Sequence, residues 1–442
     1  MMLQHSYAAA IPTAAVAWQA DQFPDLTQVF FNDSLATQLA ITNKDIETLL
    51  QQPGFALGYA GDQFGNYVPQ LGDGRAILLG ECQTSNGLID LHAKGSGRTP
   101  FSRGGDGKAP AQAMLKEVLY SEALFHLHVP TTRVLAMYHT GETILRQHPE
   151  PGALVVRTAA SHIRVGTFQY VSAQGEQQLQ ALAEYVRNRH FPDAATYADM
   201  FIEIVQRQAS LVAKWMRLGF VHGVLNSDNT LVSGESIDYG PCAFTDWYDP
   251  HAVFSSIDYI GRYAFGRQPE MVGWNLARLA QTLIPLCGSA WVQEAIHLFA
   301  AAYRDAFTQE FATALGITHV DQGIQAELIA DCLALLTLTH GDSVQSLRAL
   351  SEQNYEYFPS QWQPWLQRWR FVSPDFALMC RINPVYIPRN HIVSQAMHDA
   401  TVWEDLLTVV QNPYTRKTGK RWEKFEQPTP AEFGPYTTVC GT

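Results

Sequence analysis

The chain has 442 residues, of which 46% are hydrophobic and 16% are charged. This apolar content is enough to bury a sizeable core, so a mainly disordered chain is excluded, and the length favours two or three structural units. The formal net charge of −12 argues against a broad surface for nucleic acid or for an anionic membrane, whereas a nucleotide needs only two or three well-placed cations. We therefore expect neither nucleic-acid nor membrane partners.

Cysteine usage and the N-terminal residues indicate a cytoplasmic protein. The six cysteines are scattered singly with no CxxC pair, which argues against a zinc site or a dense disulfide framework. The first residues lack the basic and continuous apolar regions of a signal peptide. No stretch approaches the ~18 uninterrupted apolar residues of a membrane span. We therefore expect a reducing cytoplasm.

The first part of the chain is predicted to be rich in strands. Residues 1–45 are interpreted as an N-terminal extension with little periodic signal, and residues 46–170 as a strand-rich N-lobe. From Phe55 to Lys94, short apolar runs broken by glycine predict a meander of short strands. A helix is predicted over 110–126, opened by Pro110, and further strands over 132–139 and 154–158.

Residues 171–400 are predicted to form a helical C-lobe, followed by a C-terminal tail over 401–442. Apolar residues between Phe201 and Met216 fall on one helical face, and Gly219 is placed to end that helix. Another helix is predicted over 271–283, stopped by Pro285. The order predicts an α+β, bilobal protein that holds its ligand between the lobes.

The stretch from Phe220 to Trp247 contains the residues most informative about chemistry. A loop carrying His222, Asp228 and Asn229 follows the predicted helix, and Asp238-Tyr239-Gly240 comes after a short apolar step. Carboxylate and amide oxygens suit Mg²⁺. A hairpin between Asn229 and Asp238 would bring both side chains to one ion.

This order is similar to the protein-kinase signature, in which an Asn of the catalytic loop and the Asp of D-F-G bind metal. The spacing from His222 to Asn229 equals that of the kinase loop. The kinase's catalytic Asp, however, falls at Val224, which cannot accept a proton. Ordinary kinase chemistry with the usual base is therefore ruled out.

The strand-rich part offers candidates for holding phosphates. Lys94 precedes a glycine-rich segment, and Glu117 lies on the following predicted helix, as in the kinase lysine–glutamate pair. The alternative is that Glu117 pairs on the helix surface with Lys116 or Arg133. The residues alone do not choose between the two.

A glycine turn and two arginines add weaker signals. Gly72 and Gly74 flank a tight turn that ends in Arg75, where bare backbone could approach a nucleotide. Arg157 and Arg164 carry guanidinium groups that match phosphate oxygens. A hairpin turn and isolated surface arginines are the alternative interpretations.

Taken together, the motifs resemble one known family. LGDGRAILLGE, KGSGRTPFSRGGDG, SEALFHLHVPTTR, SHIRVGTFQY, HGVLNSDN, IDYGP, GRYAFGRQPEMVGWNLARLAQTL and INPVYIPRN, in this order, are similar to the selenoprotein O (SelO) family of protein adenylyltransferases. The resemblance runs from about residue 50 to the C-terminus. It implies a protein-kinase-like (pseudokinase) fold in which ATP binds in a reversed orientation, so that AMP is transferred and pyrophosphate leaves.

The resemblance also implies a role for individual residues. Asp228 would be the general base, and Asn229 and Asp238 would hold Mg²⁺ or Mn²⁺. Arg157 and Arg164 would hold the γ-phosphate. The remaining nucleotide-binding residues would be Gly72, Gly74, Arg75, Lys94, which pairs with Glu117, and Asp106 with Gly107 at the base end. The acceptor would be a Ser, Thr or Tyr hydroxyl of a protein.

The chain departs from the family pattern at one cysteine. Some members carry a cysteine after the D-Y-G segment that could pair with a residue of the tail, here Cys440. Phe254 stands at the equivalent position, and Cys242 is the substitute we considered, which requires a Cα separation below about 7 Å. In a reducing cytoplasm we expect both thiols to be reduced.

Three functions remain open at this point. The first is AMP transfer, favoured by Val224 together with Lys94, Asn229 and Asp238. The second is a catalytically silent ATP-binding scaffold, which Val224 also favours. The third, a kinase that transfers phosphate with a relocated base, ranks behind both.

Overall fold

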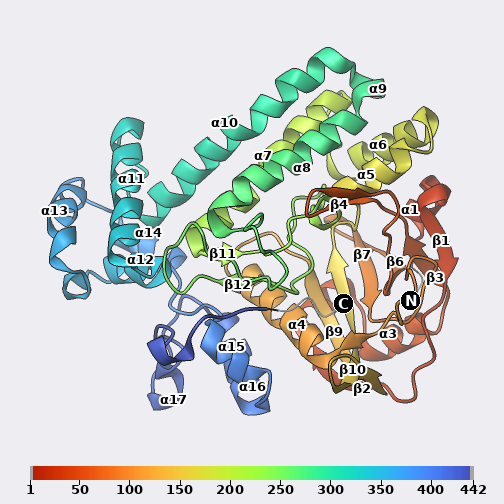
Figure 1. Ribbon diagram of the computed structural model, residues 1–442, viewed down its shortest axis with the longest axis horizontal. Helices are drawn as coiled ribbons and strands as arrows, with labels where there is room; N and C mark the ends of the chain where they lie inside the picture. Colours follow the sequence, from red (N-terminus) through yellow and green to blue (C-terminus); the bar gives the residue numbers. More distant parts are fainter. Residues whose placement is uncertain (1–2, 439–442) are drawn as a thin grey trace.

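The N-terminal part of the protein is built on one antiparallel sheet. The computed structural model describes residues 3–438, apart from the side chains of residues 293 and 296. The sheet has the strand order β1-β3-β6-β7-β10-β9-β2, and a short β8 pairs with β10 (Figure 1). Its strands are β1 (Ala15–Trp18), β2 (Thr27–Phe31), β3 (Gly54–Leu57), β6 (Ala76–Thr84), β7 (Gly87–Lys94), β8 (Ala109–Pro110), β9 (Arg133–Leu145) and β10 (Pro149–Ala159). Two small ribbons pair β4 (Gly61–Gln63) with β5 (Asn66–Val68) and β11 (Phe220–Val221) with β12 (Ala243–Phe244).

The meander between residues 55 and 94 and the strands after residue 132 are confirmed. The segment interpreted as an N-terminal extension, however, contains β1 and β2, and these strands form the two edges of the sheet. Each edge strand is largely exposed or only partly buried, so its side chains show no alternation of apolar and polar types. That segment is therefore part of the sheet.

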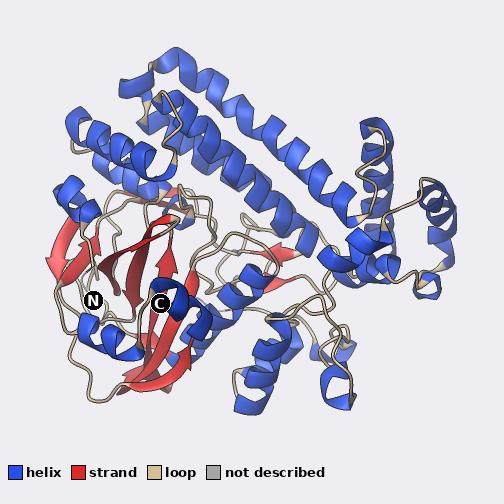
Figure 2. Ribbon diagram, turned by 180° about the vertical axis from the view of Figure 1, so that it is seen from behind, coloured by secondary structure: helices blue, strands red, loops and turns tan. Residues whose placement is uncertain are grey.

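Helices cover both faces of the sheet (Figure 2). On one face, α2 (Asp33–Leu39) and α3 (Asn43–Leu50) pack their leucines and isoleucines on the inward side chains of β6, β7, β9 and β10. On the other face, α4 (Ala111–His126) packs Met114, Val118 and Leu119 against β9 and β10. α4 was predicted within one residue of its observed start, and Pro110 is its N-cap.

The register of the central strands brings Lys94, His92 and Arg157 close together. Lys94 at the end of β7 lies opposite Val155 of β10, and His92 lies opposite Arg157. On the other side of β7, His92 faces Leu78 of β6. Because side chains alternate along a strand, His92 and Lys94 project from the same face of β7. That face is the one toward which α4 directs Glu117.

The rest of the chain is mainly helical (Figure 1). Short helices are α1 (Ser6–Ala10), α5 (Val165–Ser172), α9 (Ile284–Cys287), α12 (Ser343–Ser351), α13 (Gln363–Phe371), α14 (Phe376–Ile382), α15 (Asn390–Ala396) and α17 (Lys420–Glu423). Longer ones are α6 (Glu176–His190), α7 (Tyr197–Leu218), α8 (Gln268–Thr282), α10 (Ser289–Ala314), α11 (Gln322–Thr339) and α16 (Ala400–Val410). α8 ends one residue before its predicted end.

α7 shows how the sequence defines a helix and the loop after it. Thr196 and Asp199 form a capping box at its start, and the buried face runs from Met200 to Leu218. Gly219 ends the helix with a left-handed φ of 69°, a conformation that glycine adopts at little cost. The chain then turns into β11 and the loop that carries Asp228.

The helices α11 to α14 surround a core of their own at the far end of α10 (Figure 1). Trp362, Trp365 and Trp369 are buried in it, with the last two rings stacked at 5.7 Å. α15 and α16 instead pack on α4. Among residues 3–438, no helix combines the length and the apolar character that crossing a membrane requires.

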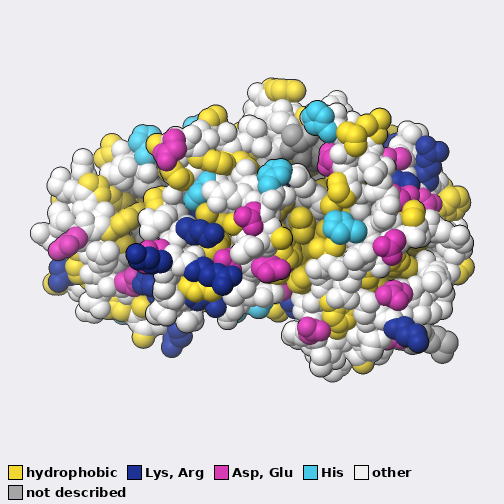
Figure 3. Space-filling view, turned by 90° about the horizontal axis from the view of Figure 1, so that it is seen from below, with side chains coloured by type: hydrophobic (Ala, Val, Ile, Leu, Met, Phe, Trp, Pro, Cys, Tyr) yellow, Lys and Arg dark blue, Asp and Glu magenta, His cyan; other side chains and the backbone are white. Residues whose placement is uncertain are grey.

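The face seen in Figure 3 carries both signs of charge. Lys and Arg side chains lie there with Asp and Glu side chains among them. The chain as a whole has 42 acidic and 30 basic residues. Acidic residues therefore outnumber basic residues in the chain as a whole.

Candidate functional site

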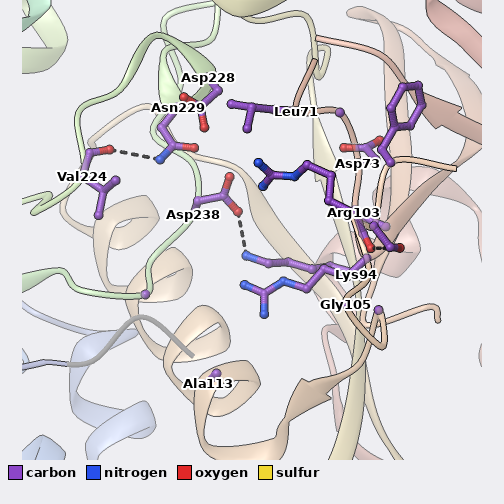
Figure 4. Close-up of a pocket in the computed structure, with 18 of the residues that line it drawn as sticks. Leu71, Asp73, Lys94, Arg103, Gly105, Ala113, Val224, Asp228, Asn229 and Asp238 are labelled. Carbon is purple, nitrogen blue, oxygen red and sulfur yellow. Dashed lines mark hydrogen bonds and ion pairs between the residues drawn. The ribbon is translucent and has the colours of Figure 1, made fainter. Parts of the chain in front are cut away.

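The twelve residues singled out from the sequence line one cavity of about 340 Å³ between the sheet and the helical part. They are Gly72, Gly74, Arg75, Lys94, Asp106, Gly107, Glu117, Arg157, Arg164, Asp228, Asn229 and Asp238. Figure 4 shows Asp228 and Asn229 entering from one side and Lys94 from the other, with Asp238 between them. The structure therefore brings residues more than 160 positions apart to one place.

Lys94 and Glu117 form a buried ion pair. Lys94 Nζ lies 2.9 Å from Glu117 Oε2, and both side chains are almost fully buried. Arg157 donates to the other oxygen of Glu117 at 2.8 Å. Burial would raise the pKa of Glu117, but the two cations outweigh it and lower that pKa. The predicted pair is confirmed, and the alternative partner Arg133 contacts Glu122 instead.

Asp238 is held by three cations. Its Oδ1 accepts from Lys94 at 2.6 Å and from Arg157 at 2.8 Å. Its Oδ2 accepts from Arg164 at 3.2 Å. Burial alone would raise the pKa of Asp238, but these cations hold it well below the usual range. The backbone at Asp238 has a φ of 66°, which is uncommon for a residue other than glycine and fixes where the carboxylate points.

The loop after α7 positions Asn229 beside Val224. Residues Ser227–Asn229 form a single 3₁₀ turn. The side-chain amide nitrogen of Asn229 donates to the Val224 carbonyl at 3.0 Å. This bond fixes the amide so that its oxygen remains available on the cavity side (Figure 4). Val224 itself lines the cavity, and its side chain has no group that can accept a proton.

Asp228 is a buried carboxylate with few partners. It is 7% exposed, and burial raises its pKa to about 6. Gln63 donates weakly to Oδ2 at 3.4 Å, and within the described residues Oδ1 accepts no hydrogen bond. A carboxylate in this state can take a proton more readily than one on the surface. Gly61 faces Oδ1 so closely that a Cβ there would lie 2.3 Å from it.

The segment from residue 230 to 237 is not the hairpin that we considered. Leu231 bridges to Arg164, and Ser236 bridges to Thr131. The backbone between Asn229 and Asp238 therefore pairs with two other segments, around residues 163–165 and 130–132. Both side chains nevertheless face the same cavity, because these segments fix the two ends of the loop.

The glycines of the cavity wall allow close packing of loops. Gly72 has a φ of 65°, and a Cβ there would lie 2.3 Å from the Phe101 ring. At Gly107, with a φ of 72°, a Cβ would lie 2.1 Å from the Gly97 carbonyl oxygen. Asp106 next to it is held by two bonds from Arg146, at 2.7 and 3.0 Å. The glycine-rich segment after Lys94 thus forms a compact wall.

Comparison with known proteins identifies the family. The family model described as protein adenylyltransferase SelO matches residues 2–424. The chain belongs to the SelO family. Proteins named protein nucleotidyltransferase YdiU are 43% identical in Mycolicibacterium paratuberculosis, 44% in Mycolicibacterium smegmatis and 46% in Corynebacterium efficiens. Each match covers 100% of this chain and 96–98% of the relative.

Membership of the SelO family makes this chain a protein nucleotidyltransferase of the adenylyltransferase type. Its substrates are therefore ATP and proteins. The match reaches the start of the chain, which extends the resemblance seen in the sequence from residue 50 onward. It also agrees with the edge strands β1 and β2, which belong to the same sheet as the cavity wall.

Among residues 3–438, no group of three or more His, Cys, Asp or Glu side chains could hold a metal ion by itself. The SelO site nevertheless has two residues that fit a magnesium ion already bound to a nucleotide. Asn229 and Asp238 supply hard oxygens, and Asn229 keeps its oxygen free by donating its N–H to Val224. Mg²⁺ commonly takes one or two protein ligands together with phosphates and waters, so this pair is a suitable set.

Several cavity residues of this SelO chain were missed in the sequence. Tyr59 stacks under the Arg164 guanidinium at 4.4 Å, and Arg146 lines the cavity beside Asp106. Asp73 lines the cavity between the two glycines and accepts from His92 at 2.9 Å. A turn aspartate and a histidine within a strand have many structural uses, so neither residue by itself predicted this contact.

The tail of the chain reaches the segment after Asp238. Thr438 donates its N–H to the Phe254 carbonyl at 2.7 Å, and Tyr436 packs on the Phe254 ring. Cys242 is buried, and its thiol lies 3.4 Å from the Tyr239 carbonyl oxygen. Cys440, for which a pairing with Cys242 was considered, lies outside the described residues.

Proposed function

We propose that this chain transfers AMP from ATP to Ser, Thr or Tyr hydroxyls of proteins, with release of pyrophosphate. The observation that carries the proposal is the placement of Asp228. Its carboxylate lies buried in the cavity, whereas the position of the kinase base is taken by Val224. The positive charges of Lys94, Arg157 and Arg164 in the same cavity suit a triphosphate.

Asp228 acts as the general base in this proposal. The hydroxyl oxygen of the acceptor forms a bond to the α-phosphorus, and the bond from that phosphorus to the bridging oxygen of pyrophosphate breaks. The hydroxyl proton passes to the Asp228 carboxylate, and the electron pair of the broken bond leaves with pyrophosphate. The raised pKa of Asp228 and its oxygen without a hydrogen bond support this role.

Lys94, Arg157 and Arg164 neutralise the phosphates. All three are buried and converge on the Asp238 carboxylate, so they are oriented before a nucleotide binds. Arg157 and Arg164 are assigned to the γ-phosphate, which the guanidinium geometry suits. The backbone around Gly72, Gly74 and Arg75 contacts the nucleotide, and Asp106 with Gly107 lies at its base end.

Asn229 and Asp238 hold Mg²⁺ or Mn²⁺ in this proposal. When bound there, the ion supplies charge neutralisation on the phosphates. Asp238 must then exchange some of its contacts with the cations for the ion. This exchange is electrostatically feasible, because the phosphates offer new anionic partners to the same cations.

The fold is proposed to be kinase-like, with a nucleotide-binding lobe up to residue 170 and a helical lobe over 171–400. The antiparallel sheet, the Lys94–Glu117 pair and the loop after α7 support this division. The nucleotide is proposed to lie in the reversed orientation, with its α-phosphorus at Asp228. We also propose that the protein is cytoplasmic, because its six cysteines are scattered singly, as is typical of proteins in a reducing compartment.

Labelled ATP tests the reaction. The chain is incubated with Mg²⁺, a protein acceptor and ATP labelled in either the α- or the γ-phosphate. Label on protein from the α position alone is the expected result. Label from the γ position would establish a kinase. Absence of any transfer by a chain that binds ATP would establish a silent scaffold.

A further inference from the structure

His92 connects the glycine turn to Arg157. It lies in β7, is fully buried, and is not among the residues that line the cavity. Its Nε2 lies 2.9 Å from Asp73 Oδ2, and its Nδ1 lies 3.3 Å from Arg157 Nε. A wall residue and a phosphate-facing arginine are thus joined through one ring behind the cavity.

The partners of His92 determine its protonation state. Arg157 Nε can only donate, so His92 Nδ1 must accept and carries no proton. The proton therefore resides on Nε2, which donates to Asp73. Burial lowers the pKa of His92, Asp73 opposes this shift, and the nearby Arg157 and Arg164 reinforce it. His92 is consequently neutral and held in one tautomer.

A second histidine restrains the plane of the ring. His162 stacks on His92 with 4.2 Å between ring centroids and 20° between planes. His162 is itself held by Asp90, whose carboxylate lies 3.1 Å from its Nδ1. Asp73, Arg157, Arg164 and His162 are the charged or titratable groups in contact with His92 or in its immediate surroundings. Rotation of the His92 ring would break contacts on three sides.

The contact with His92 differs from the other contacts of Arg157. The guanidinium NH1 donates to Glu117 and to Asp238. Both carboxylates line the cavity, and Asp238 is the proposed metal ligand, so a nucleotide complex competes for these contacts. His92 lies behind the wall, where a ligand in the cavity does not reach it. Its bond to Arg157 Nε can therefore persist when the cavity is filled.

We propose that His92 is a positioning residue that holds Arg157 at the angle needed to bind the terminal phosphate of the nucleotide. The inference deepens the proposed function, because it takes the phosphate-binding role of Arg157 from it. His92 acts only through Arg157 and touches neither ATP nor the acceptor. Its contribution belongs to ATP affinity rather than to the chemical step.

Two substitutions separate the two hydrogen bonds of His92. In His92→Asn the side-chain oxygen can take the place of Nδ1, which keeps the acceptor for Arg157 and loses the donor to Asp73. In His92→Gln the side-chain nitrogen can take the place of Nε2, which keeps the donor to Asp73 and loses the acceptor. Asp73 also accepts from the Leu57 N–H at 3.1 Å, so it retains an anchor in the Asn variant.

The expected result is a split between the two variants. His92→Gln raises the KM for ATP and the Kd of a non-hydrolysable ATP analogue on the order of tenfold, as expected for a lost bond to a charged group, with kcat little changed. For His92→Asn, the KM for ATP and the Kd of the analogue should both stay within about threefold of the parent's values. Equal ATP affinity in the two variants would overturn the proposal, as would a fall in melting temperature with unchanged affinity.

Arg157→Lys examines the same contact from the other side. Lysine keeps the charge but lacks the Nε–H that His92 accepts, so exchanging His92 for Gln in this background should change ATP affinity no further. An additional loss of affinity there would contradict the proposal. Direct ATP binding is measured without AMP transfer, so failure of the transfer reaction and failure of the His92 inference remain distinguishable.

Discussion

Lys94 Nζ lies 2.6 Å from Asp238 Oδ1, so a proposed phosphate-binding cation and a proposed metal ligand are paired with each other. The same oxygen accepts from Arg157. The charges of this cluster therefore neutralise one another. A magnesium–nucleotide complex that binds here must replace some of the contacts between Asp238 and these cations. Substitutions of Asp238 and of the nearby Asp228 should therefore have different effects.

Asp238→Ala and Asp228→Ala are expected to separate binding from turnover. Loss of Asp238 removes a proposed metal ligand, so Mg²⁺-dependent ATP binding and AMP transfer should both be lost. Loss of Asp228 removes only the proposed base, so ATP binding should persist while kcat falls by about 10²–10⁴-fold. Calorimetric titration with an ATP analogue and a transfer assay measure the two effects. Equal loss of binding in both variants would contradict separate roles.

Gly61→Ala should disturb Asp228 without removing it. The added Cβ would lie 2.3 Å from Asp228 Oδ1 and 2.4 Å from Leu71 Cδ1. The carboxylate must move, so we expect kcat to fall at least about tenfold while the Kd for ATP changes little. Gly105→Ala is the control, since Gly105 also lines the cavity and a Cβ there meets only the Ser102 carbonyl oxygen, at 3.1 Å. Similar losses of kcat in both variants would argue against the specific effect.

Glu117→Gln should destabilise the protein. The substitution leaves Lys94 and Arg157 buried with one carboxylate fewer, and breaking a buried pair costs about 3–5 kcal/mol of unfolding free energy. Glu270→Gln breaks an exposed pair with Arg267 and should cost less than about 1 kcal/mol. Urea denaturation of both variants measures the difference. Equal free energies of unfolding would show that the buried pair is not important for stability.

Glu235→Gln should stabilise the protein at high pH only. Burial raises the pKa of Glu235 to about 7, above its ordinary value of 4.5. A raised carboxyl pKa means that the folded state binds the proton more tightly, so the stability it contributes is present below pH 4.5 and is lost as the pH rises through 7. The glutamine amide stays neutral at every pH, so the variant avoids this loss of unfolding free energy, which is at most about 3 kcal/mol.

Melting temperatures of the parent and of Glu235→Gln at pH 5 and pH 8.5 test this expectation. The melting temperature of the variant, relative to that of the parent, should be higher at pH 8.5 than at pH 5. The side chain accepts from the Ala160 N–H, a contact that the glutamine oxygen can keep. A difference in melting temperature that does not depend on pH would mean that Glu235 is ionised normally in the folded protein.

The sequence predicts elements whose signal is local. Helix α7 carries its apolar face, its capping box and its terminal Gly219 within one stretch of chain, and its position was predicted closely. The edge strands β1 and β2 carry no such signal, because one side of each faces solvent and their partners lie far along the chain. Strand pairing over such distances is set by the whole sheet, which one segment does not encode.

The candidate site divides in the same way. The Lys94–Glu117 pair was one of two interpretations that the residues left open, because a kinase-like pair and a helix-surface pair with Lys116 or Arg133 both fit the spacing, and the structure shows the kinase-like pair. The convergence of Arg157 and Arg164 on Asp238 could not be predicted, because it depends on the register of β7 with β10 and on the bridge from Arg164 to Leu231. His92 carried no motif at all, and only its place opposite Arg157 reveals its contact.

The pairing of β2 with β9 has a consequence for biosynthesis. Residues 27–31 leave the ribosome early, yet their hydrogen-bonding partners lie between residues 136 and 139. About a hundred further residues must be translated before this edge can close, and until then the strand is exposed to other chains. Slow or interrupted translation before residue 140 should therefore favour aggregation of the nascent chain.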